Sequence, residues 1–94
     1  MNILAVLVEF MGTFILLSVI VATHSPLLVG ATLAMLMYLG AAVSGAHFNP
    51  ATTVMTLVNR GIAGDNAAAY ILAQIAAAVA AVTVYNRLKK QRVL

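Results

Sequence analysis

The sequence predicts an all-α membrane protein, with three transmembrane helices and one short helix that enters the bilayer without crossing it. Of its 94 residues, 64% are hydrophobic and only 7% are charged. A soluble domain of this size exposes most of its residues to water and needs more charge than that. The 50 residues from Phe10 to Asn59 contain no Asp, Glu, Lys or Arg. We therefore expect a single membrane domain over residues 1–94, surrounded by the lipid bilayer.

Three segments are long and apolar enough to cross a bilayer, which takes about 20 residues. They are residues 3–22, 26–43 and 67–84. Pro26 follows a very short link and suits the first turn of the second helix, where a backbone N–H is not needed. The chain is therefore expected to be a multi-pass protein.

Small residues recur every four positions on two of these helices, a spacing that lets helix backbones approach closely. The third helix has Ala69, Ala73, Ala77 and Ala81, and the second has Gly30 and Ala34. An Ala-rich helix also produces such spacing by chance, so the pattern favours tight packing without requiring it.

The segment between the second and third helices, residues 44–58, is too apolar for an ordinary loop and too short to cross. Its part from Asn49 to Val58 is predicted to form a helix of about 15 Å, at 1.5 Å per residue, whereas the hydrocarbon layer is about 30 Å thick. A re-entrant half-helix, which enters the bilayer and leaves on the same face, satisfies both facts. Irregular backbone at that depth is tolerated only where protein buries it or water reaches it. The residues before the half-helix, Ser44 to Phe48, therefore imply a cavity or a pore.

The triplet Asn49-Pro50-Ala51 has the pattern of a helix start, because Asn is a preferred N-cap and Pro suits the first helical position. If the Asn49 side-chain oxygen accepts a hydrogen bond from Ala51 or Thr52, its amide group keeps two donors that point away from the helix. The helix end also carries about half a positive elementary charge. Such a site offers hydrogen bonds to a neutral solute and repels a cation.

The stretch SGAHFNPATT, residues 44–53, closely resembles the first signature loop of the aquaporins, also called major intrinsic proteins. Residues 9–14, EFMGTF, look like the first-helix motif of that family, and residues 70–74, YILAQ, look like its third-helix motif. The motifs stand in the family's order, and the resemblance covers most of the chain. It implies one half of the aquaporin inverted-repeat fold, of the first-repeat type.

The resemblance implies a passive channel subunit for water or a small neutral solute such as glycerol, with no enzymatic activity and no cofactor. In the family, two half-helices, one from each inverted repeat, meet head to head in the middle of the membrane. These 94 residues contain one Asn-Pro-Ala, so the expected pore needs a second, inverted copy or another aquaporin half. The family places four pores side by side, and the same arrangement would give a higher oligomer of half-chains.

Seven residues are expected to line the pore or bind the solute: Val29, Met37, His47, Asn49, Pro50, Ala51 and Thr52. By their spacing from Asn49, Val29 and Met37 would lie near the filter level at the two mouths, which would be wide because neither is as bulky or polar as the residues often found there. The family's second repeat has an Arg just after its Asn-Pro-Ala, where this chain has Thr52. A pore of two such halves would exclude cations by helix dipoles alone.

Four residues are expected to support the loop: Glu9, Ser44, Gly45 and Gln74. A charge inside a membrane helix costs about 2.5–3.5 kcal/mol on insertion scales and needs partners. The resemblance implies that Glu9 binds backbone N–H groups of the loop, while Gly45 accepts the positive φ of a close turn. His47 can brace the loop or line the pore. The only other His is His24, far off in a turn, so no metal site is expected.

Four of the five basic residues fall in the last eight positions, within a predicted tail over residues 86–94. Such a cluster suits a membrane surface with anionic lipid, whereas a nucleic-acid site would need a larger basic face. The positive-inside rule places this tail in the cytoplasm, with the plasma membrane as the expected location. That orientation is the reverse of an aquaporin first repeat, and an inverted homodimer should have little such bias.

Two other functions stay open. A proton-coupled small exporter of dual topology would use Glu9 and depend on a pH gradient, but it leaves the signature loop unexplained. A non-conducting accessory subunit, or a truncated half-channel, would neither pair nor conduct. The sequence does not decide among water, glycerol and other solutes.

Overall fold

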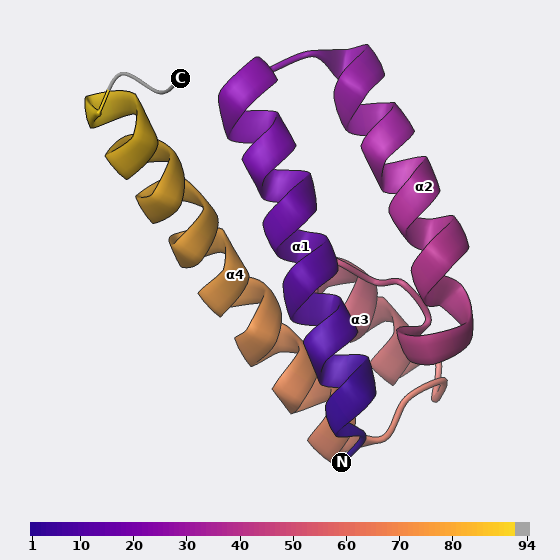
Figure 1. The fold of residues 1–94 in the computed structure, drawn as a ribbon. Helices are drawn as coiled ribbons and strands as arrows, with labels where there is room; N and C mark the ends of the chain where they lie inside the picture. The colour runs from indigo at the N-terminus through magenta and orange to yellow at the C-terminus, as the bar shows by residue number, and fades with distance from the viewer. Residues whose placement is uncertain (92–94) are drawn as a thin grey trace.

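Four α-helices make up most of the protein in a computed structural model, which describes residues 1–91 (Figure 1). Helix α1 spans Ile3–Thr23, α2 spans Pro26–Ser44, α3 spans Pro50–Val58 and α4 spans Gly64–Lys90. Helices α1, α2 and α4 are each long and apolar enough to cross a membrane. The predicted all-α fold with three membrane-competent helices is therefore confirmed, while the re-entry of α3 into the bilayer stays a prediction.

Polar side chains fix where the first two helices begin, because the first N–H groups of a helix lack partners within it. The Asn2 side chain accepts a hydrogen bond from the Ala5 N–H at 3.1 Å, and the Ser25 hydroxyl accepts one from the Leu28 N–H at 3.2 Å. His24 ends α1 in the left-handed conformation, with φ of 49°. The link between α1 and α2 is therefore tight, and the two helices run antiparallel.

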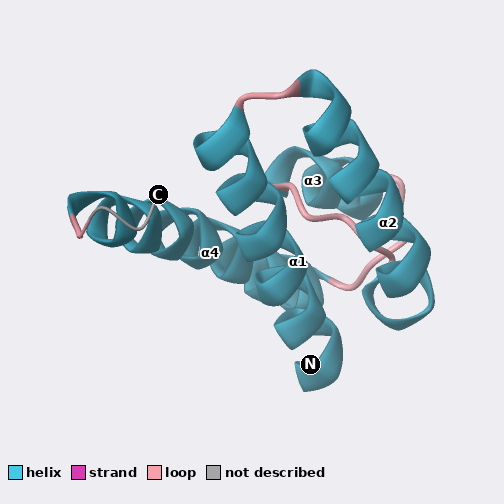
Figure 2. Ribbon diagram, turned by 45° about the horizontal axis from the view of Figure 1, so that its top comes forward, coloured by secondary structure: helices cyan, strands magenta, loops and turns pink. Residues whose placement is uncertain are grey.

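Helix α1 lies between α2 and α4 and packs against both, while α3 packs against α4 (Figures 1 and 2). Helix α3 occupies only the half of the molecule that contains the N-terminus (Figure 1). The molecule is 45 Å long, which matches the thickness of a bilayer with its headgroups, about 40–45 Å. In the half of the molecule opposite the N-terminus, no short helix lies beside the long helices of residues 1–91 (Figure 1).

Small side chains bring α4 close to the rest of the protein. Its buried residues follow one another in steps of three and four positions: Ala67, Tyr70, Gln74, Ala77 and Ala81. Alternating steps of three and four residues keep side chains on one face of a helix. Steps of four alone, as in the predicted alanine series, move gradually around the helix. Ala69 and Ala73 are therefore only half-buried. Gly30 on α2 is exposed with no neighbour within 4 Å of an added Cβ. Gly30 therefore makes no helix contact among residues 1–91, and Ala34 is exposed as well.

The bounds of α4 differ from the predicted range of residues 67–84. The helix starts three residues earlier and continues to Lys90, because Arg87, Lys89 and Lys90 are favourable beside the negative end of the helix dipole. Residues 86–90 of the predicted basic tail are therefore helical, and its residues 92–94 lie outside the described residues. The other long helices match the predicted ranges to within one residue.

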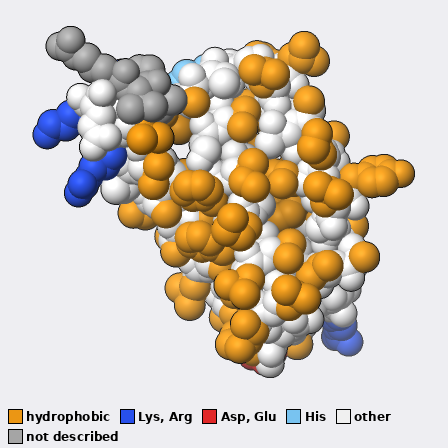
Figure 3. Space-filling view, viewed as in Figure 1, with side chains coloured by type: hydrophobic (Ala, Val, Ile, Leu, Met, Phe, Trp, Pro, Cys, Tyr) orange, Lys and Arg blue, Asp and Glu red, His pale blue; other side chains and the backbone are white. Residues whose placement is uncertain are grey.

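Apolar side chains are spread over the whole face in view in Figure 3, and basic side chains lie near two opposite ends of that face. Large exposed hydrophobic residues occur on every long helix, for example Leu4, Leu27 and Leu72. Soluble monomers rarely expose so much apolar surface. The surface is therefore suited to lipid.

Replacing Ala77 by Leu is expected to lower the free energy of unfolding by about 1–3 kcal/mol, because overpacking strains a close-packed contact. Ala77 is fully buried, whereas its neighbour Ala76 is exposed. Unfolding in mixed micelles titrated with dodecyl sulfate measures the change. Ala76→Leu is the matched control and should leave stability within about 0.5 kcal/mol. Equal effects of the two substitutions would contradict the packing described above.

Candidate functional site

The loop that joins α2 to α3 has an unusual backbone. Gly45, Ala46 and Phe48 all have positive φ, at 85°, 54° and 54°. The left-handed conformation costs a residue other than Gly about 1–2 kcal/mol. Such a loop persists only where the surrounding structure holds it in place.

The carboxylate of Glu9 on α1 supplies that support. Its Oε1 accepts hydrogen bonds from the Phe48 N–H at 2.7 Å and from Gln74 Nε2 at 2.9 Å. Its Oε2 accepts from the Ser44 hydroxyl at 2.6 Å and from the His47 N–H at 3.0 Å. Glu9 is 0% exposed. Four donors, two for each oxygen, therefore replace the water that a carboxylate would otherwise hold.

Ser44 and Tyr70 extend this network to the end of α2. The Ser44 hydroxyl accepts a hydrogen bond from the Ala46 N–H at 3.1 Å, and the Tyr70 hydroxyl donates to the Ser44 carbonyl at 2.8 Å. The Tyr70 ring also meets the His47 ring edge-on, with centroids 5.2 Å apart. The last turn of α2 and the loop are thereby tied to α4.

Gln74 and Thr53 connect the same network to α3. The two Gln74 N–H groups are used by Glu9 and by the Thr53 hydroxyl, at 2.9 and 3.0 Å, and a flipped amide would place its oxygen against the carboxylate. Thr53 also lies 2.8 Å from His47 Nδ1. The Thr53 hydroxyl therefore joins Gln74 on α4 to the imidazole of the loop. A Cβ on Gly45 would lie 3.4 Å from His47 Nε2, an ordinary contact, so it is the positive φ of 85° that favours Gly at this position.

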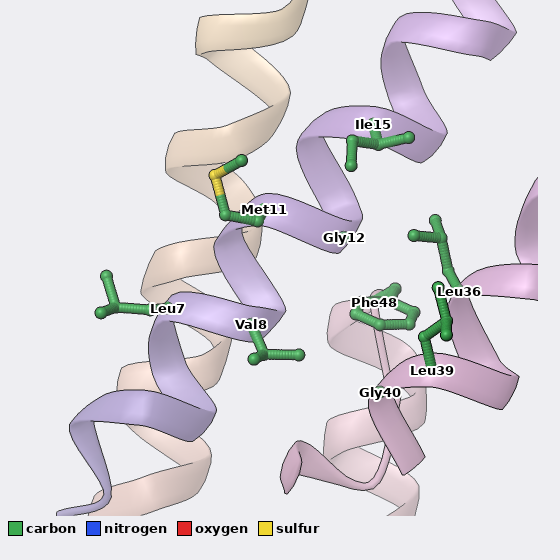
Figure 4. A pocket seen from close by; sticks show the side chains of 9 residues that line it. All are labelled: Leu7, Val8, Met11, Gly12, Ile15, Leu36, Leu39, Gly40 and Phe48. Carbon is green, nitrogen blue, oxygen red and sulfur yellow. The ribbon is translucent and has the colours of Figure 1, made fainter.

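Phe48 anchors the loop from the other side, with its ring between α1 and α2 (Figure 4). The ring is 3% exposed and belongs to an apolar cluster with Leu16 and Ala46. A Cβ on Gly12 would overlap the ring, and a Cβ on Gly40 would come within 3.0 Å of its tip. These two glycines therefore leave the space that the ring fills.

Helix α3 begins directly after the loop. The Asn49 side-chain oxygen accepts a hydrogen bond from the Ala51 N–H at 2.8 Å, and Pro50 occupies the first helical position. The Asn49 amide nitrogen keeps two N–H donors beside the positive end of the helix. Asn49 is exposed, so these donors can reach a small molecule.

A cavity of about 520 Å³ lies at this helix end. Of the seven residues predicted to line a pore, five line the cavity: Met37, His47, Asn49, Pro50 and Thr52. The other two do not, because Ala51 is exposed elsewhere on α3 and Val29 packs against the cluster around Phe48. Leu16, Leu33, Val79 and other apolar side chains form most of the remaining wall. The cavity therefore combines a few hydrogen-bonding groups with an apolar wall.

The four predicted support residues meet in one place, since Ser44 and Gln74 each donate a hydrogen bond to Glu9 and Gly45 follows Ser44 at the start of the same loop. Gln74 also reaches the cavity wall. No group of three or more potential metal ligands of the His, Cys, Asp or Glu type occurs within residues 1–91. Sequence reasoning missed Thr53 as a link and Phe48 as an anchor. The one signal for Phe48 was a single aromatic residue in a loop of small and polar ones.

The chain is similar to known proteins over most of its length. The family described as Major intrinsic protein matches residues 24–93. A curated relative from Lactiplantibacillus plantarum, named Glycerol uptake facilitator protein-like 6, is 38% identical over 84 residues. The match covers 80% of this chain but only 39% of the relative, so the chain spans about two fifths of that protein's length. No solved structure matches the chain.

Replacing Glu9 by Ala is expected to destabilise the protein by roughly 2–6 kcal/mol, since the backbone N–H groups of His47 and Phe48 lose their partner at about 1–3 kcal/mol each. The Phe48 N–H is buried and the His47 N–H is partly buried. Thermal unfolding in detergent measures the effect. Asp65→Asn removes the only other acidic side chain, which is exposed and pairs with the N-terminus at 3.4 Å. A loss no larger than that of this control would contradict the role given to Glu9.

Replacing Gly12 by Ala is expected to destabilise the protein by about 1–3 kcal/mol, because the new methyl group displaces the Phe48 ring. The additional substitution Phe48→Leu should recover part of the loss, which a double-mutant cycle measures. Gly30→Ala is the control, since a Cβ there meets nothing within 4 Å and Ala is the better helix former. A Gly12→Ala protein as stable as the Gly30→Ala protein would show that the ring does not need this space.

Proposed function

This chain belongs to the major intrinsic protein family, and we propose on that basis that it supplies one half of a passive membrane pore for water or a small neutral solute. It is an integral, multi-pass membrane protein, and we place it in the plasma membrane. The observation that carries the proposal is the position of Asn49, at the N-terminus of α3 and on the wall of the 520 Å³ cavity. The relative named as a glycerol uptake facilitator favours glycerol among the solutes.

The chemistry of the cavity suits a solute that is neutral and accepts hydrogen bonds. The two free donors of Asn49 replace water around such a solute as it passes, while the apolar wall offers nothing to a charged one. The partial positive charge at the start of α3 adds a barrier to cations. Movement down a concentration gradient needs no further chemistry, so we propose no enzymatic activity.

The pore needs a second half, and we propose a second, inverted copy of this chain. These 94 residues contain a single Asn-Pro-Ala. Helix α2 supports a large further interface, because only Gly40 and Ser44 are buried on it and Tyr38 is 91% exposed. In this arrangement α3 is re-entrant, and two α3 N-termini meet near the middle of the membrane. The basic end of α4 favours one orientation in the membrane, so it disfavours the insertion of copies in both orientations. Another aquaporin half is therefore the competing partner.

The surroundings of Glu9 argue against a proton-coupled exporter. A transported proton needs a route from water to the carboxylate, yet Glu9 is fully buried and does not line any of the four best-formed cavities within residues 1–91. Each of its oxygens already accepts two hydrogen bonds. These contacts support a structural role for Glu9.

Osmotic shrinkage of proteoliposomes, followed by stopped-flow light scattering, tests the proposal. Vesicles with the purified chain should shrink much faster than empty vesicles, with low activation energy and without dependence on a pH gradient. An isosmotic glycerol gradient across the same vesicles measures their permeability to glycerol. Shrinkage at the bare-lipid rate, with the protein folded and inserted, would refute a pore made of this chain alone and direct the search to another half.

The substitution Asn49→Asp separates capping from solute binding. Asp caps a helix as well as Asn does, but it has no N–H donors and brings a negative charge. We expect unchanged thermal stability and a roughly tenfold lower permeability, the effect of about 1.4 kcal/mol on the barrier. Asn59→Asp makes the same chemical change at the exposed far end of α3 and should leave permeability intact. Equal permeability of the two variants would contradict the role of Asn49.

A further inference from the structure

The C-terminal end of α4 extends beyond the part of the helix that can lie in hydrocarbon. The helix has 27 residues, which gives about 40 Å at 1.5 Å per residue, whereas the hydrocarbon layer is about 30 Å thick. Its other end holds Asp65 near the N-terminus of the chain. The last two turns stand apart from α1 and α2 (Figures 1 and 2). Asn86, Arg87 and Lys90 therefore reach the level of the lipid headgroups.

A hollow of about 260 Å³ lies on this part of α4, lined by Thr83, Asn86, Arg87 and Lys90. The spacing of three and four residues places these side chains on one face of the helix. The Thr83 hydroxyl donates to the Val79 carbonyl at 2.6 Å, so the free donors of the hollow come from the other three residues.

The charge of this hollow is positive, and no Asp or Glu side chain of residues 1–91 lines it. The chain has two acidic residues, and Glu9 is enclosed by the loop network while Asp65 pairs with the N-terminal amine. Lys89 is turned elsewhere, since its ammonium group lies 5.9 Å from the centroid of the Tyr85 ring. Arg87 and Lys90 are both exposed. Two cationic groups and one amide therefore face the same space.

We propose that this hollow binds the phosphate of an anionic phospholipid headgroup. Arg offers two parallel N–H donors that match phosphate oxygens, and Lys adds a point charge. The Asn86 amide supplies a further donor. The position at headgroup level commits the site to a lipid, because an anionic membrane surface holds such phosphates next to these residues. The proposal does not depend on the pore, so its test uses lipid binding and not flux.

Native mass spectrometry of the detergent-purified chain, titrated with phosphatidylglycerol or with phosphatidylcholine of the same acyl chains, tests the site. The wild type should bind phosphatidylglycerol more tightly than phosphatidylcholine. The double variant Arg87→Gln/Lys90→Gln should lose on the order of 25-fold in affinity for phosphatidylglycerol, at about fivefold for each basic residue. Equal affinity of the wild type for both lipids would overturn the proposal.

Two controls locate the binding. Lys89→Gln removes one charge from the same turn but outside the hollow, and Arg60→Gln removes one from the connector after α3. Both variants should keep most of the preference for phosphatidylglycerol. If Lys89→Gln lost as much affinity for phosphatidylglycerol as Arg87→Gln alone, the hollow would not be the binding site. Glycerol 3-phosphate at millimolar concentration should leave the lipid bound. Its displacement of the lipid would show a site for free phosphate and contradict the assignment.

Discussion

One buried carboxylate holds the structure around the candidate site together. Glu9 on α1 accepts hydrogen bonds from the backbone of the loop before α3 and from Gln74 on α4. Two long helices and the loop therefore form a single unit, although the loop itself has little regular structure. The position of Asn49 follows from this, since it comes directly after the two loop residues that Glu9 binds.

The loop is costly, and several contacts offset its cost. Ala46 and Phe48 adopt positive φ, and the Thr13 hydroxyl and the Gln74 amide oxygen are buried with no hydrogen-bond partner among the described residues. Against these stand the charge-assisted hydrogen bonds of Glu9, which are the stronger kind, and the burial of the Phe48 ring. Together these contacts hold the N–H donors of Asn49 next to the cavity, in a protein whose surface is largely apolar. Local strain of this sort is common where a protein binds a ligand.

The sequence was enough to predict the three long helices, because runs of about 20 apolar residues identify them without any tertiary information. The cap at Asn49 followed from local chemistry, and the grouping of Glu9 with Gln74 followed from a resemblance between motifs. The roles of Gly12, Phe48 and Thr53 could not be read in this way. Each depends on a partner more than 20 residues away and on a fit between surfaces, which neither hydrophobic periodicity nor helix propensity encodes.

Amide hydrogen exchange of the wild-type protein in lipid nanodiscs is the sharpest test of whether Glu9 holds the loop through backbone hydrogen bonds. The amides of His47 and Phe48 should exchange as slowly as those inside α1, because Glu9 accepts hydrogen bonds from both, at 3.0 and 2.7 Å. Exchange as fast as at the exposed residues Ala63 and Gly64, which precede the first hydrogen-bonded amide of α4, would mean that the carboxylate does not hold the loop, and the geometry proposed for Asn49 would lose its support.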